Sequence, residues 1–245
     1  MKVLAIGAHA ADVFDCAGGA MANFADAGIE TYLAVITHGA YSHAQEITSK
    51  SQAQDIEAIK ALKKRECDTA AKCVGIRCIR YFDYDDEPFI PTREAVLSLG
   101  EHIREVRPDI VVTHHRTEFN HHDHPVVGDT VLRAIKAAQR WIQGSEREPF
   151  AVKRLYFFGV QYRRDTTMLG ASVLPATFVV DITDSIDKKI SALAAFESQS
   201  YQGQYNEAWA RQRAEKIEGN WGFMHGVKYA EEFIASDPQI VKLLP

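Results

Sequence analysis

The sequence lacks the features that mark membrane and secreted proteins. Its 245 residues include only four cysteines, without Cys-x-x-Cys spacing or the density of a disulfide scaffold, which favours a reducing compartment. No apolar run is long enough to cross a bilayer, and the apolar start breaks at His9 and Asp12, too early for a signal peptide. We therefore expect a cytoplasmic protein that does not associate with membranes.

Internal repeats, low-complexity tracts and a strong excess of one charge are also missing. The net charge is -5, and acidic and basic residues are interspersed, so nucleic acid is not an expected partner. With 46% hydrophobic and 25% charged residues, the length suits one globular domain with a substantial core. Because no segment reads as a linker, we expect residues 1–245 to form a single domain.

What the sequence does contain is an alternation of strand and helix patterns. Buried strands are expected at 3–7, 31–37, 78–82, 108–113, 155–160 and 177–182, and helices at 52–74, 93–106, 184–198, 206–218 and between the first two strands. Such alternation predicts an α/β fold, a Rossmann-like, doubly wound, mostly parallel sheet flanked by helices. Ligands of these folds gather at the carboxyl ends of the strands.

Two polar residues, His9 and Asp12, follow the first strand directly, where the chain turns into a helix. An imidazole nitrogen and a carboxylate oxygen are both sound zinc ligands. Taken alone, the pair fits equally well with a helix-capping aspartate and a hydrogen-bonded loop histidine.

A second group of histidines follows the strand at 108–113. Five of the ten histidines of the chain fall between His114 and His124. A solvated loop rarely concentrates imidazole in this way. A metal site needs histidines both as ligands and as groups that hydrogen-bond and orient those ligands, so we predict a metal site here. The count does not decide which histidines are ligands, because adjacent residues such as His121 and His122 usually point in different directions.

Four segments together resemble a known family. They are GAHAADVFDCAGG at 7–19, PDIVVTH at 108–114, HHDH at 121–124 and GVKYAEEF at 226–233. Their order is similar to that of the LmbE-like or PIG-L superfamily of zinc-dependent N-acetylglucosaminide deacetylases. The resemblance covers nearly the whole chain, and it implies a small-molecule substrate and a homo-oligomer, a trimer or hexamer.

The resemblance also implies roles for individual residues. His9, Asp12 and His124 match the metal ligands, His121 matches the histidine that stabilises the oxyanion, and Asp123 matches the acid that orients it. Three protein ligands leave a fourth position for water, whose pKa falls towards neutrality on zinc. Zinc is the expected metal, with another divalent ion as the alternative.

One departure from the family motif affects the expected chemistry. The family has His-Pro-Asp-Asp where this chain has His9, Ala10, Ala11 and Asp12, so the aspartate that takes the proton from water is Ala11. A positioned general base typically contributes ~10²–10⁴-fold to the rate. A substitute base would come from the loop after the second strand, where His43 is the first candidate and Glu46 the second. The other interpretation of His43 is an ordinary exposed loop histidine.

The superfamily also includes a hydratase of the 4-oxalomesaconate hydratase type, which lacks the same aspartate. A hydratase acting on an unsaturated oxo-carboxylic acid needs cationic groups for its carboxylates. Arg116, Arg163 and Arg164 follow strands and are candidates, although surface solvation explains them as well, and Tyr162 is a candidate for the substrate crevice.

The sequence therefore leaves three functions open. The first is a zinc-dependent hydrolase that cleaves an N-acyl amide, such as an N-acetyl group, on a small polar substrate. The second is the zinc-dependent hydratase. The third is a non-catalytic protein that binds a metal or a small molecule. The missing aspartate counts against plain deacetylation, whereas the intact His121 counts for a step with a developing oxyanion.

Overall fold

The computed structural model of the chain describes residues 1–42, 55–118, 121–158, 176–199 and 206–236. Its strands are β1 (Lys2–Gly7), β2 (Glu30–Thr37), β3 (Cys78–Tyr84), β4 (Ile110–His114), β5 (Arg154–Phe158), β6 (Phe178–Asp181) and β7 (Ala230–Ala235). Its helices are α1 (Asp12–Asp26), α3 (Ile56–Val74), α4 (Arg93–Val106), α5 (Asp123–Ala138), α7 (Ile186–Ala194), α8 (Glu207–Lys216) and α9 (Glu218–His225), with a short 3-10 turn at Glu197–Gln199.

The strands form one mixed sheet in the order β3-β2-β1-β4-β5-β7-β6. The first five strands of that order are parallel to one another, whereas β7 pairs antiparallel with both β5 and β6. The structure confirms the predicted Rossmann-like, mostly parallel α/β sheet. Strand order reverses at β1, and ligands of such folds bind at the carboxyl ends of the strands on either side of this point, here β1 and β4.

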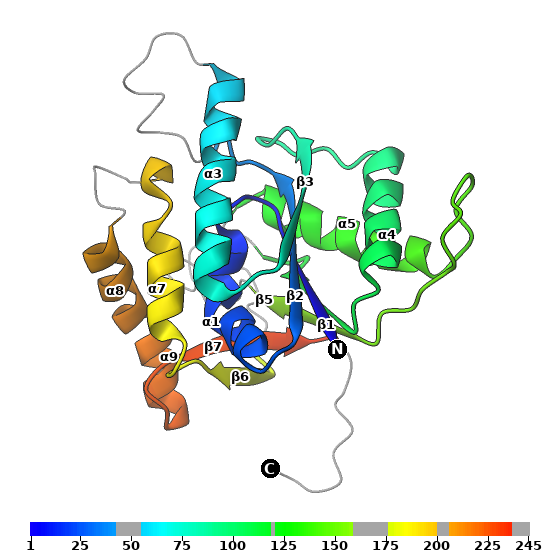
Figure 1. Cartoon of the computed structure of the whole chain (residues 1–245). Helices are drawn as coiled ribbons and strands as arrows, with labels where there is room; N and C mark the ends of the chain where they lie inside the picture. The colour runs from blue at the N-terminus through cyan, green and yellow to red at the C-terminus, as the bar shows by residue number, and fades with distance from the viewer. Residues whose placement is uncertain (43–54, 119–120, 159–175, 200–205, 237–245) are drawn as a thin grey trace, which may run out of the picture.

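Helices cover both faces of the sheet (Figure 1). On one face α1 packs against α7, and α3 and α8 flank them; on the other face α4 and α5 pack together. Each layer has its own apolar core, with the rings of Phe14 and Phe196 in tilted contact in the first and Leu99 and Val131 buried in the second. No helix of the described segments is long and apolar enough to span a bilayer.

Buried ionic contacts anchor α1 to the C-terminal part of the chain. The Glu231 carboxylate, on β7, accepts hydrogen bonds from the backbone N–H groups of Gly19 (2.9 Å) and Ala20 (2.8 Å). Lys189 Nζ lies 2.7 Å from the same carboxylate and 2.8 Å from that of Glu218. Because breaking such a buried pair is strongly destabilising, these contacts fix the helix whose first residue belongs to the site described below.

Several element boundaries differ from the sequence prediction. The helix expected at 184–198 ends at Ala194 and is followed by the 3-10 turn, and the helix expected at 206–218 ends at Lys216, after which α9 begins. The sequence analysis did not identify α5 or β7. Strand β7 returns antiparallel between two other strands, a position that depends on its partners and not on its own sequence.

Candidate metal centre

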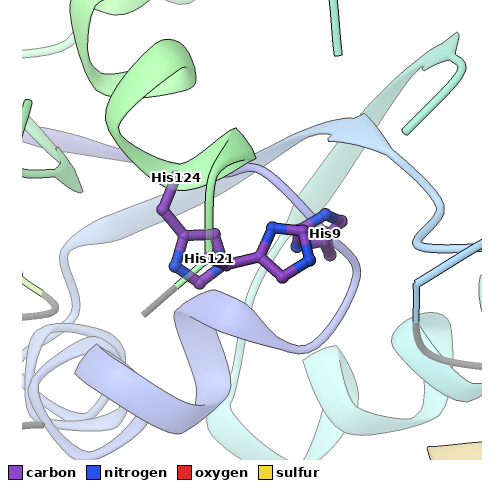
Figure 2. Close-up of side chains that lie close together, drawn as sticks. All are labelled: His9, His121 and His124. Carbon is purple, nitrogen blue, oxygen red and sulfur yellow. The ribbon is translucent and has the colours of Figure 1, made fainter. Parts of the chain in front are cut away.

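Polar side chains meet where the neighbouring parallel strands β1 and β4 end. His9 and Asp12 come from the turn between β1 and α1, and His114 is the last residue of β4. His121 and His124 come from the segment that leads into α5, and Figure 2 shows their rings beside that of His9. The ring centroid of His9 lies 4.6 Å from that of His121 and 5.3 Å from that of His124.

The Asp12 carboxylate stands at the centre of this group. Its Oδ2 accepts a hydrogen bond from the His9 backbone N–H at 2.7 Å, because Asp12 opens helix α1. The same oxygen lies 3.4 Å from His9 Nδ1 and 3.5 Å from His124 Nε2. Ligand atoms bound to tetrahedral zinc at ordinary bond lengths are about 3.3 Å apart, so both distances suit a shared ion.

A second carboxylate, that of Glu118, joins two of the histidines. Its Oε2 lies 2.9 Å from His114 Nδ1, and its Oε1 lies 2.5 Å from His124 Nδ1. A proton held on Nδ1 of His124 leaves Nε2 with a lone pair that faces Asp12. This is the carboxylate–histidine arrangement that orients metal-ligating imidazoles.

Asp123 supports His9 in the same way. Its Oδ2 lies 3.3 Å from His9 Nε2, which leaves Nδ1 of His9 on the side of Asp12. The carboxylate is held by backbone N–H groups, from Phe89 at 2.7 Å and from Glu87 at 3.1 Å. The family resemblance assigns Asp123 to His121, but its Oδ2 is 3.9 Å from His121 Nδ1, beyond hydrogen-bond distance. In this structure Asp123 orients His9, which lies in the turn after β1.

The imidazoles around the centre lower the pKa values of its carboxyl groups. Burial by itself raises the pKa of the Asp12 carboxyl, but the positive charges of His124 and His9 hold it well below its usual range. Burial opposes a charge on His124, yet Asp12 and Glu118 outweigh it and raise the pKa of His124 to about 10. For Glu118 too, the charge of His114 overcomes burial and lowers the pKa. The carboxylates are therefore paired with imidazoles, and a divalent cation that binds here would take the place of imidazole protons.

The donor set fits a metal ion. The ligand atoms of His9, His121 and His124 all lie within 4.8 Å of one another, as do those of Asp12, His114 and His124. Nε2 of His124 is buried and has no hydrogen-bond partner within the part of the chain described. Imidazole nitrogens with one carboxylate oxygen are typical zinc ligands, although the same set also accepts other borderline divalent metals. The choice of His9, Asp12 and His124 as the ligands stays a prediction.

Ala11, which the family resemblance places at the position of the proton acceptor, is buried beside this centre. Ala11 precedes Asp12 as the N-cap residue of α1, and its side chain is 6% exposed. A methyl group at this point offers no proton acceptor.

Of the remaining predicted site residues, the structure describes Arg116 alone. Arg116 is exposed in the loop after β4. His43, Glu46, Tyr162, Arg163 and Arg164 lie outside the described residues, so their roles stay predictions.

The sequence analysis missed two acids that the structure brings to this site. Glu118 holds His114 and His124, and Glu87, from the loop after β3, lies 3.0 Å from His121 Nε2. A signal for Glu118 was present, because it is the single acid in the histidine-rich segment before His121. No comparable signal marks Glu87, which follows a different strand.

This arrangement defines the class of protein: a metal-dependent enzyme built at the edge of a Rossmann-like sheet. The PIG-L family, described as GlcNAc-PI de-N-acetylase, matches residues 4–135, and the chain belongs to this family. Its relatives are deacetylases and a hydratase, so the chain is an enzyme of the deacetylase or hydratase kind.

Relatives of both kinds are similar to the chain. The 4-oxalmesaconate hydratase of Pseudomonas putida is 24% identical over 245 residues, which is 99% of this chain and 92% of that protein. A 1D-myo-inositol 2-acetamido-2-deoxy-alpha-D-glucopyranoside deacetylase of Segniliparus rotundus is 32% identical over 128 residues, 43% of this chain and 40% of that protein. The crystal structure of 4-carboxy-2-hydroxymuconate hydratase from Pseudomonas putida has a TM-score of 0.81 at 22% identity, covering 100% and 99% of the two chains.

Proposed function

We propose that this protein is a zinc-dependent hydratase, a lyase that adds water across the carbon–carbon double bond of an unsaturated oxo-carboxylic acid. The observation that carries the proposal is Ala11, an apolar residue at the position of the family's proton acceptor. The relative that matches nearly the full length of both chains is a hydratase of such an acid. Hydrolysis is the first of the functions that the sequence leaves open, and the full-length similarity to a hydratase moves it to second place.

The two reactions differ in where protons must go. Amide hydrolysis needs a group that takes a proton from water and delivers it to a departing amine. Hydration has no departing group: a carbon–oxygen bond forms, and the proton returns to the neighbouring carbon of the substrate. Both reactions need a group that takes a proton from water, and the loss of the carboxylate at Ala11 removes the one that the family uses to deliver this proton to a departing amine.

Several side chains would perform the hydration. A bound divalent ion supplies Lewis acidity and lowers the pKa of water. Glu118 and Asp123 hold His124 and His9 in fixed orientations through the contacts described above. Nδ1 of His121 accepts the Asp123 backbone N–H at 3.2 Å, so the His121 proton sits on Nε2 and can be donated to negative charge on the substrate.

Other parts of the mechanism are proposals that rest on the sequence. His43 and Glu46 are the candidates for activating water. Arg116, Arg163 and Arg164 are the candidates for binding substrate carboxylates, because Arg matches carboxylates with paired hydrogen bonds. We also propose that the chain forms a homo-oligomer, which light scattering of the purified protein would test.

The decisive experiment compares two substrate classes. Zinc-loaded protein would be assayed on unsaturated oxo-dicarboxylates and on N-acetylated amino sugars, with His124→Ala as the control that loses the metal. We expect turnover of the first class only. Turnover of the sugars alone would overturn the proposal, and no turnover with metal-dependent binding would indicate a non-catalytic protein.

Ala11→Asp gives a second test on the same chain. We expect hydration to fall, because a carboxylate in this buried position competes with the substrate for the metal and its water, and we expect no deacetylation to appear. A gain of deacetylation would instead identify a rerouted deacetylase.

Deacetylation remains the second candidate because the His121-x-Asp123-His124 segment is intact. The deacetylase relative with 32% identity also supports it, although it covers less than half of this chain.

A further inference from the structure

Two buried carboxylates each hold a serine through both its backbone N–H and its hydroxyl group. Asp86, in the loop after β3, accepts the N–H of Ser42 at 2.8 Å and the Ser42 hydroxyl at 2.7 Å. Glu66, on α3, accepts the N–H of Ser198 at 2.7 Å and the Ser198 hydroxyl at 2.6 Å. We call Asp86 with Ser42 the first clamp and Glu66 with Ser198 the second clamp. Neither carboxylate belongs to the predicted ligand set of the metal centre.

The first clamp holds three successive residues of the loop after β2. Besides the N–H of Ser42, Asp86 accepts the backbone N–H groups of Ala40 at 3.0 Å and of Tyr41 at 3.2 Å. Loss of such an acceptor leaves a buried N–H group without a partner, which costs free energy. The carboxylate of Asp86 therefore fixes the course of the backbone in this loop.

Both clamped segments border the turn between β1 and α1, which carries the first two predicted metal ligands. On one side, Thr37 donates its backbone N–H (2.8 Å) and its hydroxyl (2.9 Å) to the backbone oxygen of Ala8, so the loop after β2 leaves the sheet next to this turn. On the other side, Phe196 contacts Phe14 in the first turn of α1, with ring centroids 5.6 Å apart. Phe196 precedes the serine of the second clamp by two residues.

A buried lysine relates the two clamps to each other. Lys63 lies one turn before Glu66 on α3, and its side chain is fully buried. Burial lowers the pKa of Lys63 to about 7, whereas the charges of Glu66 and Asp86 raise it, so the lysine lies near both carboxylates. The two clamps therefore share one buried cation.

We propose that Asp86 and Glu66 are positioning residues: they hold the two clamped segments against the turn that binds the metal, and catalysis requires both segments in place. The clamping depends only on the hydrogen bonds described above. The catalytic part rests on the proposed function, because the loop after β2 carries His43 and Glu46, the candidates for activating water. A misplacement of about 1 Å can cost about 100-fold in rate.

Amide hydrogen exchange of the zinc-loaded protein tests the first clamp without an assay of activity. Asparagine has one acceptor oxygen where aspartate has two, so Asp86→Asn cannot accept from all three N–H groups and the hydroxyl together. We expect exchange of the N–H groups at residues 40–42 to accelerate at least about tenfold. Asp85→Asn, a change at the exposed neighbouring carboxylate, which contacts Lys60, should match wild type.

Hydration kinetics of the same variants test the catalytic part. Asp86→Asn should lower kcat at least about tenfold. Its zinc dissociation constant should stay within about threefold of the wild-type value, because Asp123 still holds the neighbouring backbone of the loop after β3. A general loss of structure would weaken zinc binding as well, so this split separates positioning from folding.

The second clamp gives a graded test. A glutamine at position 66 can accept the Ser198 N–H with its oxygen and donate its NH₂ group to the Ser198 hydroxyl, so Glu66→Gln should keep kcat within about threefold of wild type. Glu66→Ala offers no acceptor and should lower kcat at least about tenfold. Glu57→Ala, at an exposed position of α3 that contacts Lys60, is the matched control and should match wild type.

Each outcome decides one part of the proposal. Unchanged amide exchange in Asp86→Asn overturns the first clamp, and faster exchange with unchanged kcat keeps this clamp but refutes its role in the reaction. An equal loss of kcat in Glu66→Gln and Glu66→Ala refutes the hydrogen-bonding role of the second clamp. If zinc binding and kcat fall together, both residues are structural and the positioning role falls.

Failure of the proposed function gives a different result. If wild type turns over N-acetylated sugars and not the unsaturated acids, hydration is refuted, and the same comparison of kcat is made with the sugars. If wild type turns over neither class, the catalytic part falls, and amide exchange still decides the first clamp.

Discussion

Replacement of Glu118 by glutamine should weaken metal binding without altering any predicted ligand. The carboxylate accepts from Nδ1 of both His114 and His124. A glutamine of the same shape has one acceptor oxygen and one NH₂ donor, so it can satisfy only one of the two histidines. If His124 loses its partner, its proton is no longer confined to Nδ1, and the form that presents a lone pair at Nε2 becomes less populated.

The size of the effect follows from the position of Glu118. Removing an outer carboxylate from a ligating histidine usually lowers metal affinity 10–100-fold, which corresponds to about 1.4–2.7 kcal/mol of binding free energy. Glu118 is buried and its carboxylate contacts two imidazoles, so we expect a loss towards the upper end of that range. The effect on unfolding of the metal-free protein should be smaller, because the amide keeps one hydrogen bond.

A competition titration with a zinc-binding dye would measure the dissociation constant for wild type, Glu118→Gln and the surface control Glu105→Gln. The control should match wild type. A ratio below about threefold for Glu118→Gln would refute the reasoning, because it would mean that His124 keeps its orientation without the carboxylate.

Two further variants test the packing around the site and a buried charge. Gly128→Ala should lower the unfolding free energy by about 1–3 kcal/mol in urea melts, because its Cβ would lie 2.6 Å from the backbone oxygen of His114. The control Gly219→Ala should not, because the atom nearest to its Cβ would be 3.6 Å away. Burial lowers the pKa of Lys63 from 10.5 to about 7, so between these values the unfolded chain binds a proton that the folded protein lacks, and stability from this lysine rises with pH. Lys63→Met should reduce the increase of unfolding free energy between pH 7 and pH 9 by up to roughly 1.4 kcal/mol per pH unit. If the unfolding free energy of Lys63→Met depended on pH in the same way as that of the exposed control Lys64→Met, the assignment would be contradicted.

The strand and helix patterns predicted the parallel half of the fold well. The predicted helix at 93–106 coincides with α4, and the predicted strand at 31–37 differs from β2 by one residue. These elements were predictable because each buries one continuous face, which imposes its period on the sequence. The sequence patterns did not predict β7, because its position between β5 and β6 depends on strands from other parts of the chain.

The candidate site divides in the same way. His9, Asp12, His121, Asp123 and His124 were predictable because they fall in short motifs after strands, and the structure brings them together. Their pairings were not predictable. The sequence suggested that Asp123 serves His121, but the turn of the chain at α5 places its carboxylate on His9.

The sequence by itself determined the family, the parallel sheet and the histidine-rich edge at which a metal would bind, because these depend on local periodicity and on motifs of a few residues. It also showed Ala11 at the position where the family resemblance expects an aspartate. Only the tertiary structure decided which carboxylate holds which imidazole, and only it brought Glu87 beside His121. Such contacts join loops that follow different strands, and their geometry is set by the packing of the whole sheet and not by the sequence of any one segment.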